Sequence, residues 1–276
     1  METEKYVSVI IPTFNRCFLL KKAIESVLAQ TYRHFELIVV DDGSTDQTAE
    51  LLAAYDEVIY LRQENSGPAA ARNRGVRAAA FDLIAFLDSD DCFDKRKLEI
   101  QVAAMRDNPA CLISHTDELW FRHGQVLNQK NRHQRAGGFI FAECLPLCAV
   151  GMSTVMLRRR LFDAVGFFDE DFPCCEDYDL WLRVAANHAF LLIDRPLTIK
   201  DGGRPDQVSY QHRVGMDQFR IRALGKQLAA GTLTARQTEL ARAELARKCR
   251  IYGNGCLKHG RSAEGRYYLE LPARYG

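Results

Sequence analysis

The sequence predicts an α/β protein with a mostly parallel central sheet flanked by helices and a C-terminal helical extension. Over roughly the first 115 residues, short β-branched runs alternate with helical patterns, which is typical of strands joined by crossover helices. Beyond residue 211, the pattern indicates helices alone. Hydrophobic residues make up 47% of the 276 residues and charged residues 26%, the ordinary balance of a globular protein. Disordered, collagen-like and purely coiled-coil chains are therefore excluded.

Four short apolar runs predict buried strands in the first half of the chain, and each is followed by a helical pattern. The first run ends at Pro12, and the next helix places Leu19, Ala23 and Val27 at helical spacing. The expected strands are 7–11, 36–40, 57–61 and 83–87, and the expected helices are 18–30, 47–55, 67–80 and 95–106.

The rest of the chain is mixed up to about residue 200 and helical after a break at residues 202–205 (GGRP). The expected strands here are 111–115, 154–158 and 190–194, and the expected helices are 161–165, 177–187, 211–230, 235–260 and 263–271. We expect a main domain over residues 1–210 and a basic helical extension over residues 211–276.

The sequence predicts a cytoplasmic protein without a membrane span. No run approaches the roughly 18 apolar residues that a span requires, and the charged N-terminal residues do not resemble a signal peptide. The nine cysteines form no C-x-x-C pair, so we expect no zinc site.

Charge is distributed unevenly along the chain. Residues 1–210 carry 24 basic and 31 acidic side chains, whereas residues 211–276 carry 13 and 5. A basic tail on an acidic body suggests an anionic partner, such as lipid headgroups or a phosphate-bearing acceptor. Peripheral contact with the inner membrane face is one interpretation, and a solvated helical surface is the other. We expect no nucleic-acid partner.

Polar clusters follow three of the predicted strands. They are residues 12–15 (PTFN), 41–42 (DD) and 88–91 (DSDD), and parallel strands would bring all three to one edge of the sheet, where ligands bind in such folds. Neither a G-x-G-x-x-G nor a G-x-x-x-x-G-K-[ST] motif occurs, which argues against dinucleotide-binding and P-loop sites.

The cluster at residues 88–91 predicts a divalent metal. Asp88, Asp90 and Asp91 lie within four residues, and like charges this close repel unless a cation compensates them. Hard carboxylate oxygens suit Mg²⁺ or Mn²⁺, which also bind substrate phosphates. A structural turn is the alternative, because Asp is common in turns.

Two further residues are candidates for ligand contact. The Asp42 carboxylate could accept a hydrogen bond from a nucleotide base or ribose, although turn and N-cap chemistry is the alternative. Arg72 lies in an alanine-rich helix after a tight turn and could reach a diphosphate as a bidentate donor.

Three carboxylates begin the helix predicted over residues 177–187. Glu176, Asp177 and Asp179 are favourable there through the helix dipole, but a carboxylate at this position could also take a proton from an attacking hydroxyl. Trp181 lies on the apolar face of this helix, so we expect it in the core rather than under a sugar.

Together these segments resemble family 2 glycosyltransferases, which have the GT-A fold. The resemblance covers about residues 5–210 and depends on the ordered set rather than on one motif. The matching segments are 7–16 (VSVIIPTFNR), 40–46 (VDDGSTD), Asn65-x-Gly67 with 71–73 (ARN), 86–91 (FLDSDD), 165–170 (VGFFDE) and 176–183 (EDYDLWLR).

The resemblance implies a role for each matching residue. Nucleotide-sugar binding is implied for Pro12, Thr13, Asn15, Asp42, Arg72, Asp88, Asp90 and Glu176. Metal binding is implied for Asp90 and Asp91. Asp177 matches the catalytic base, which deprotonates an acceptor hydroxyl in an inverting reaction. The resemblance leaves open which nucleotide base Asp42 contacts. Uracil is the family's commonest base, but the N–H groups of guanine could also donate a hydrogen bond to Asp42.

One segment departs from the family pattern. Many relatives carry a His near the metal, where this chain has Arg204. An Arg cannot ligate a metal, although it can neutralise a diphosphate, and His212 could substitute if the loop folds back.

The sequence therefore predicts an inverting, metal-dependent glycosyltransferase that moves a sugar from a nucleoside-diphosphate sugar to a glycan or lipid-linked acceptor hydroxyl in polysaccharide biosynthesis. A UDP-sugar is the expected donor. The alternatives are a nucleotide-sugar-binding pseudoenzyme and a sugar nucleotidyltransferase. The latter usually has a glycine-rich loop after its first strand, which residues 12–15 lack.

Overall fold

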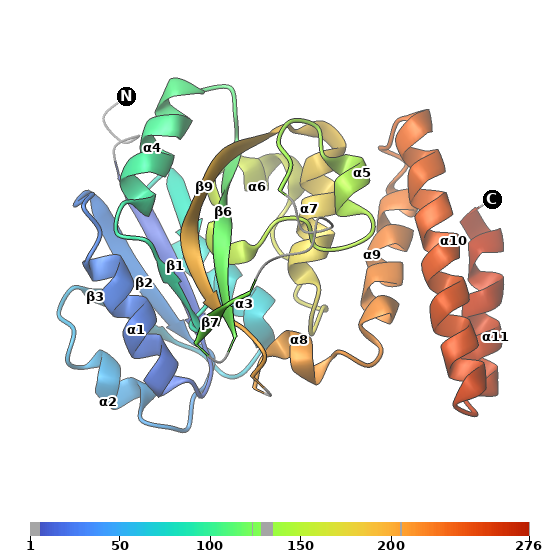
Figure 1. The fold of residues 1–276 in the computed structure, drawn as a ribbon, viewed down its shortest axis with the longest axis horizontal. Coiled ribbons are helices and arrows are strands. Elements are labelled where there is room, and N and C mark those ends of the chain that lie inside the picture. Colours follow the sequence, from blue (N-terminus) through green and yellow to red (C-terminus); the bar gives the residue numbers. More distant parts are fainter. Residues whose placement is uncertain (1–5, 123, 128–134, 205, 276) are drawn as a thin grey trace.

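The computed structural model describes residues 6–122, 124–127, 135–204 and 206–275, in which helices flank a curled central sheet (Figure 1). The strands are β1 (Val7–Thr13), β2 (Phe35–Asp41), β3 (Val58–Arg62), β4 (Leu83–Phe86), β5 (Asp91–Phe93), β6 (Ile113–Arg122), β7 (Gln125–Val126), β8 (Met156–Arg158) and β9 (Phe190–Asp201). The α-helices are α1 (Cys17–Leu28), α2 (Thr48–Leu52), α3 (Gly67–Ala78), α4 (Lys97–Asp107), α5 (Phe141–Cys144), α6 (Arg160–Val165), α7 (Glu176–Asn187), α8 (Val208–Gln211), α9 (Met216–Ala230), α10 (Ala235–Lys258) and α11 (Ser262–Glu270). Single 3₁₀ turns lie at Met152–Thr154 and Leu271–Tyr275.

The strands follow the order β3-β2-β1-β4-β8-β6-β9-β5, and β7 extends β6 at its end. The first four strands are parallel, while β8 runs antiparallel to both of its neighbours and β5 runs antiparallel to β9. Strands β1, β2 and β4 therefore end at the same edge of the sheet, as the sequence predicts.

Alternation along β1 explains why helices cover both faces. Val9 and Ile11 belong to one buried cluster with Ile24 of α1, whereas Ile10 belongs to a second cluster with Val76 of α3. Successive side chains of a strand point to opposite faces, so an uninterrupted apolar run needs cover on both. The clusters also contain residues of α2 and α4 on the first face and of α5, α6 and α7 on the second.

The main differences from the predicted elements lie in the second half. Strand β9 continues to Asp201, although the apolar run ends at Asp194 and Pro196 follows. Proline removes a ladder hydrogen bond, and the pairing with β6 shifts register on both sides of Asp117, opposite Pro196. The three-residue strand β5 begins inside the acidic cluster, where the sequence predicts no strand. Pro205, part of the predicted break, lies outside the described residues.

The C-terminal helices pack against the rest of the chain and use part of their charge there. Ile221 of α9 and Leu245 of α10 share a buried cluster with residues of α7. The ammonium of Lys226 lies 2.5 Å from Asp169 Oδ2 and 2.8 Å from Asp179 Oδ1. The uneven charge of the sequence is thus partly balanced within the molecule. The division at residue 210 and the membrane contact of this tail stay predictions.

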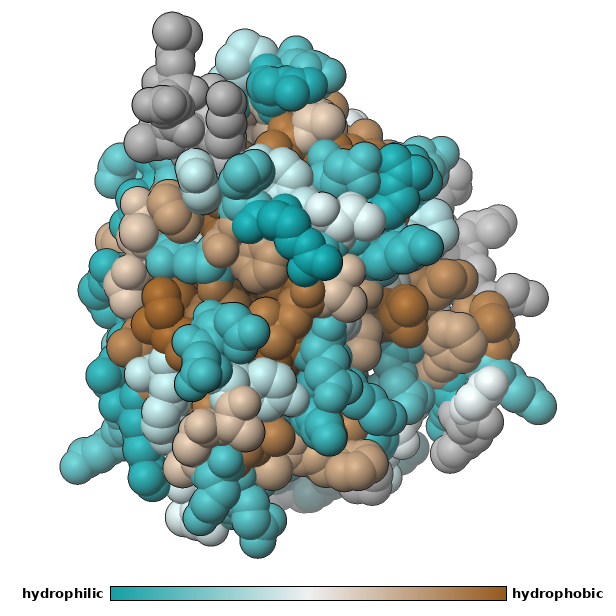
Figure 2. Space-filling model, turned by 90° about the vertical axis from the view of Figure 1, so that its left-hand side faces the viewer, coloured by the Kyte–Doolittle hydropathy of each residue, from teal (hydrophilic) through white to brown (hydrophobic). Residues whose placement is uncertain are grey.

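No helix within the described ranges combines the length and the apolar character needed to cross a bilayer. Figure 2 shows the end of the molecule that lies to the left in Figure 1, where hydrophilic and hydrophobic side chains are intermixed. The elements at this end expose Phe18 of α1 and both Ile59 and Tyr60 of the edge strand β3.

The first residue of α4, Lys97, is fully buried. Lys97 Nζ donates to Gln101 Oε1 at 2.6 Å and to the carbonyl of Thr154 at 3.0 Å, and it lies 4.8 Å from the ring centre of Phe93. Burial disfavours the charged ammonium and lowers the pKa of Lys97 to about 7.

This burial predicts a pH dependence of stability. Between pH 7 and the ordinary lysine pKa near 10.4, the unfolded chain binds more protons at Lys97 than the folded chain, so stability rises with pH. The free energy of unfolding of the wild type minus that of Lys97→Met should rise by up to about 1.4 kcal/mol per pH unit in this window. Urea denaturation of both proteins at pH 7, 8 and 9 measures it, and a constant difference would contradict the lowered pKa.

Candidate active site

The polar clusters predicted from the sequence meet at the carboxyl-terminal edge of the parallel strands. Thr13 ends β1, Asp42 follows β2, and Asp88 lies between β4 and β5. The backbone N–H of Asp42 donates to the carbonyl of Thr13 at 2.9 Å, which joins the first two clusters directly.

Asp42 is buried and organises the turn that precedes α3. Its Oδ1 accepts hydrogen bonds from Gln63 Nε2 at 2.7 Å and from the backbone N–H of Ser66 at 2.9 Å. Its Oδ2 accepts one from the N–H of Gly67 at 2.8 Å. A carboxylate has about four acceptor positions, so one remains for a ligand. Contact of Asp42 with a nucleotide base stays a prediction.

The last residue of β1 and the loop that follows it form one side of the site. Thr13 Oγ1 is buried and has no hydrogen-bond partner among the described residues, as a group awaiting a ligand would be. Pro12 precedes it in β1. Asn15 has a left-handed backbone (φ 51°), and its side chain accepts from the N–H of Thr45 at 2.7 Å while its own N–H donates to Ser44 Oγ. Asn15 therefore holds two loops together.

Arg72 joins the acidic cluster to the start of α7. Its guanidinium is buried, and it donates to Glu176 Oε1 at 2.5 Å and to Asp88 Oδ1 at 2.8 Å. Burial alone would lower the pKa of Arg72, but the two carboxylates outweigh it and raise that pKa. Burial raises the pKa of Glu176 in spite of the Arg72 charge. The Nε of Arg72 has no partner within the described ranges.

Ser153, which the sequence did not single out, fixes two of the aspartates. Its hydroxyl donates to Asp91 Oδ2 at 2.5 Å and accepts from the backbone N–H of Asp88 at 3.0 Å. Lys200 Nζ lies 3.1 Å from the same oxygen of Asp91, because β5 and β9 place these two residues opposite each other. Burial nevertheless raises the pKa of Asp91 to about 7.

Asp90 is paired with arginine. Arg204 lies 2.5 Å from its Oδ2, and Arg16 lies 3.4 Å from its Oδ1. His212, the other candidate considered for this place, lies instead with its ring edge-on to Phe219, with centroids 6.0 Å apart. Of the two alternatives, the structure therefore brings Arg204 to the acidic cluster.

Four cationic side chains, Arg16, Arg72, Lys200 and Arg204, thus surround the three aspartates. No group of three or more His, Cys, Asp or Glu in the described part of the chain is arranged to hold a metal ion. Any divalent cation here would therefore need oxygens from a bound phosphate, which is how Mg²⁺ is often held. Lys200 and Ser153 carried no signal in the sequence because only the fold brings them near.

Asp177 lies half-buried in the first turn of α7. Its Oδ1 accepts from the backbone N–H of Tyr178 at 2.7 Å, and the thiol of Cys148 lies 3.1 Å from its Oδ2. Cys175, just before the helix, has a left-handed backbone (φ 67°). Such strain in a residue other than glycine often marks functional sites.

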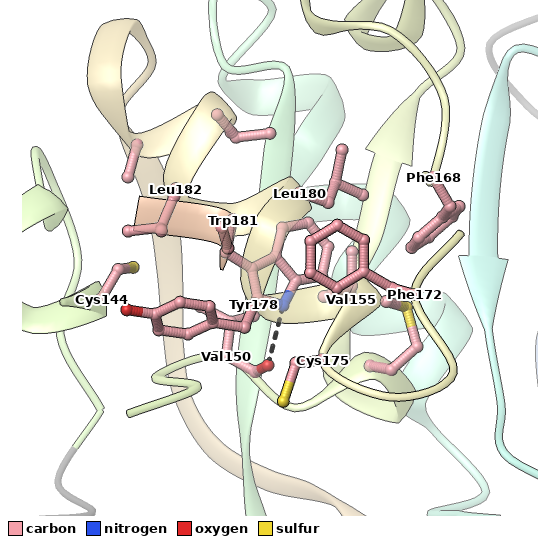
Figure 3. Close-up of a cluster of buried hydrophobic side chains, with 14 of the residues drawn as sticks. Cys144, Val150, Val155, Phe168, Phe172, Cys175, Tyr178, Leu180, Trp181 and Leu182 are labelled. Atoms are coloured by element: carbon pink, nitrogen blue, oxygen red, sulfur yellow. Dashed lines mark hydrogen bonds between the residues drawn. The ribbon is translucent and has the colours of Figure 1, made fainter. Parts of the chain in front are cut away.

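Trp181 lies in the core, as the sequence predicts. Its side chain is 1% exposed and its Nε1 donates to the carbonyl of Val150 at 3.0 Å (Figure 3). The apolar face of α7 therefore anchors the helix, while its acidic first turn reaches the site. A helix start with a partly exposed carboxylate can accept a proton, and the adjoining cationic groups can bind an anionic ligand.

Comparison with known proteins identifies the family. The sequence model described as "Glycosyl transferase family 2" matches residues 8–166, more than half of the chain. The chain belongs to this family. The resemblance noted in the sequence is therefore confirmed.

Two curated relatives show the extent of the similarity. A Rickettsia felis protein named "Uncharacterized glycosyltransferase" is 39% identical over 201 residues, covering 70% of this chain and 32% of the relative. The chain thus spans about a third of that relative's length. The Escherichia coli protein "UDP-Glc:alpha-D-GlcNAc-diphosphoundecaprenol beta-1,3-glucosyltransferase WfgD" is 34% identical over 181 residues, covering 64% of this chain and 69% of the relative.

A solved structure shows the same fold. The structure of S. aureus TarS in complex with UDP-GlcNAc superposes with a TM-score of 0.75 at 19% identity, covering 97% of this chain and 79% of that one. The predicted α/β class with the GT-A fold is confirmed.

Proposed function

We propose that this family member is an inverting, metal-dependent glycosyltransferase, and that it moves a sugar from a nucleoside-diphosphate sugar to an acceptor hydroxyl in polysaccharide biosynthesis. The observation that carries the proposal is the Arg72 bridge, which unites Asp88 with Glu176, the neighbour of Asp177. Asp177, the proposed proton acceptor, thus adjoins the cationic side chains around the aspartates, at the edge where Thr13 ends β1 and Asp42 follows β2.

In the proposed reaction, Asp177 takes the proton of the acceptor hydroxyl as the oxygen attacks the anomeric carbon of the donor sugar. The attack from the face opposite the leaving group inverts the configuration. Arg72 and Arg204 lie where guanidinium groups can stabilise the charge that develops on the departing diphosphate. Thr13 and Asp42 hold the nucleoside, with the free hydroxyl of Thr13 as one donor or acceptor.

The acidic cluster would hold a Mg²⁺ or Mn²⁺ ion only together with the oxygens of a bound diphosphate. The carboxylates of Asp90 and Asp91 would supply the hard oxygen donors, although one oxygen of Asp91 is committed to Ser153 and Lys200. Bound there, a divalent cation supplies charge neutralisation for the diphosphate. Arg204 must give up its contact with Asp90 for that carboxylate to ligate the ion.

The relatives guide the choice of substrates. WfgD is named for a UDP-glucose donor and a lipid-diphosphate acceptor, and TarS was solved with UDP-GlcNAc. We therefore propose a UDP-sugar as donor and a glycan or lipid-linked sugar as acceptor. UDP-glucose and UDP-GlcNAc, each offered with an N-acetylglucosaminyl diphospholipid, are the first pairs to assay by UDP release.

The test of the donor site is calorimetric titration with UDP, dTDP and GDP, each with Mn²⁺ and with EDTA. We expect one nucleotide to bind, and to bind more tightly with Mn²⁺ because the ion compensates charge on both Asp90 and the diphosphate. Absence of binding by all three would contradict the proposal. Equal affinity with Mn²⁺ and with EDTA would contradict its metal dependence.

Two alanine variants make this titration specific. Asp90→Ala should remove most of the Mn²⁺-dependent gain in affinity. Asp107→Ala is the matched control, because its carboxylate is exposed and, among the described residues, pairs only with Arg106, away from the site. A Mn²⁺ effect that survives in Asp90→Ala would remove Asp90 from the metal set.

A further inference from the structure

The segment after α5 is fastened to α7 at two points. The hydroxyl of Tyr178 donates to the carbonyl of Leu145 at 2.6 Å, and the indole of Trp181 donates to that of Val150 at 3.0 Å. Both aromatic side chains are buried, and Figure 3 shows the Tyr178 ring pointing toward Cys144 and the Trp181 indole directed at the Val150 carbonyl. Buried hydrogen bonds of this kind fix backbone position because breaking them leaves unpaired polar groups. The intervening residues are therefore held at a set distance from α7.

Cys148 lies between these two points and touches the proposed base. Its sulfur is 3.1 Å from Asp177 Oδ2 and 3.3 Å from the carbonyl of Val150. The other carboxylate oxygen, Oδ1, accepts from the backbone N–H of Tyr178. One oxygen of Asp177 is thus held by its own helix and the other by a thiol from a separate segment. A carboxylate has about four acceptor positions, so others stay open to a substrate hydroxyl.

The thiol remains protonated and can donate. Burial raises the pKa of Cys148 well above its ordinary value, and the adjacent Asp177 charge raises it further. Cys144 and the cationic Arg135 and Arg220 are also close enough to interact electrostatically with the thiol. The charges of Arg72 and Glu176 are also close enough to interact with that of Asp177.

We propose that Cys148 is a positioning residue, whose thiol donates a hydrogen bond to Asp177 Oδ2 and fixes the carboxylate for proton abstraction. The inference rests on the proposed role of Asp177 as the base. Cys148 itself touches no reacting atom. Its effect is to stop rotation of the carboxylate about its last torsion, which is otherwise broad.

Paired substitutions test this role through turnover. Cys148→Ala removes the donor and should lower kcat roughly three- to tenfold, with the KM for the nucleotide sugar unchanged. Cys148→Ser keeps a donor and should recover most of the loss. Cys144→Ala is the matched control. That cysteine is buried just before the same segment, and among the described residues its thiol makes no hydrogen bond to a carboxylate. Equal kcat in the Ala and Ser variants would overturn the proposal.

Alkylation of the thiol tests the contact without any substrate. Asp177→Asn removes the negative charge beside Cys148, so the thiol pKa should fall and iodoacetamide should react faster at pH 8. A fall of one unit gives about tenfold more thiolate. Peptide mass spectrometry measures the rate at Cys148, with the half-buried Cys92 as internal reference.

The two experiments separate failure of the inference from failure of the proposed function. An unchanged alkylation rate in Asp177→Asn would show that the thiol and the carboxylate are not in contact, which overturns the inference alone. Near wild-type turnover in Asp177→Asn would instead overturn the role of Asp177 as the base. The inference then falls with it, even if the alkylation rate rises.

Discussion

Replacing Asp177 with Asn is expected to lower sugar transfer roughly 10²–10⁴-fold while nucleotide binding stays nearly unchanged. An amide has almost the shape of a carboxylate, and its oxygen can still accept from the N–H of Tyr178, but it cannot take a proton. UDP release from UDP-glucose or UDP-GlcNAc, with the N-acetylglucosaminyl diphospholipid acceptor, measures transfer. Calorimetry with UDP measures binding in the same preparation.

This variant should be about as stable as the wild type, because relief of a repulsion offsets the loss of a favourable charge at the start of the helix. The Asp177 charge adds to the burial that raises the pKa of Glu176, so its removal relieves a repulsion in the first turn of α7. A loss of activity without a loss of thermal stability would therefore be chemical. Asp163→Asn, the same substitution at an exposed position of α6, is the matched control. Turnover near that of the wild type in Asp177→Asn would remove Asp177 from the proposed role.

The parts of the fold that the sequence predicts are those set by local patterns. An apolar run such as residues 7–11 indicates a strand covered on both faces, and β1 has that environment. The ends of parallel strands share one edge, so the polar residues after β1, β2 and β4 could be placed together before any contact was known. The start of α7 followed from its acidic first turn and its apolar face in the same way.

The contacts that shape the site could not be predicted, because they join residues far apart in the chain. Arg72 and Glu176 are separated by 104 residues, and Arg204 and Asp90 by 114. Asp91 meets Lys200 only through the register of β5 on β9, and β5 is too short to leave a periodic signal. Local sequence indicates which residues are polar at a strand end, but not which cation will neutralise each of them.

The second large effect is expected at Arg72, whose guanidinium is buried between two carboxylates. Arg72→Met should destabilise the protein by about 3–5 kcal/mol, the usual result of breaking a buried ion pair on one side. The cost arises because Glu176 is buried and loses its only ion-pair partner in the described residues. Urea denaturation at pH 7 measures the free energy of unfolding. Nucleotide binding should weaken as well, because the same guanidinium orients Asp88.

A second substitution separates these two effects. In Arg72→Met/Glu176→Gln the buried carboxylate becomes a neutral amide, so much of the lost stability should return. Asp88 remains without its arginine, so nucleotide binding should stay weak. Arg77→Met on the same helix is the matched control, because Arg77 is exposed and lies 3.7 Å from Glu170, and we expect a change within about 0.5 kcal/mol. If Arg72→Met were as stable as the control, the ion pair between Arg72 and Glu176 would be contradicted. Burying the Glu176 carboxylate without a counter-charge should lower the free energy of unfolding.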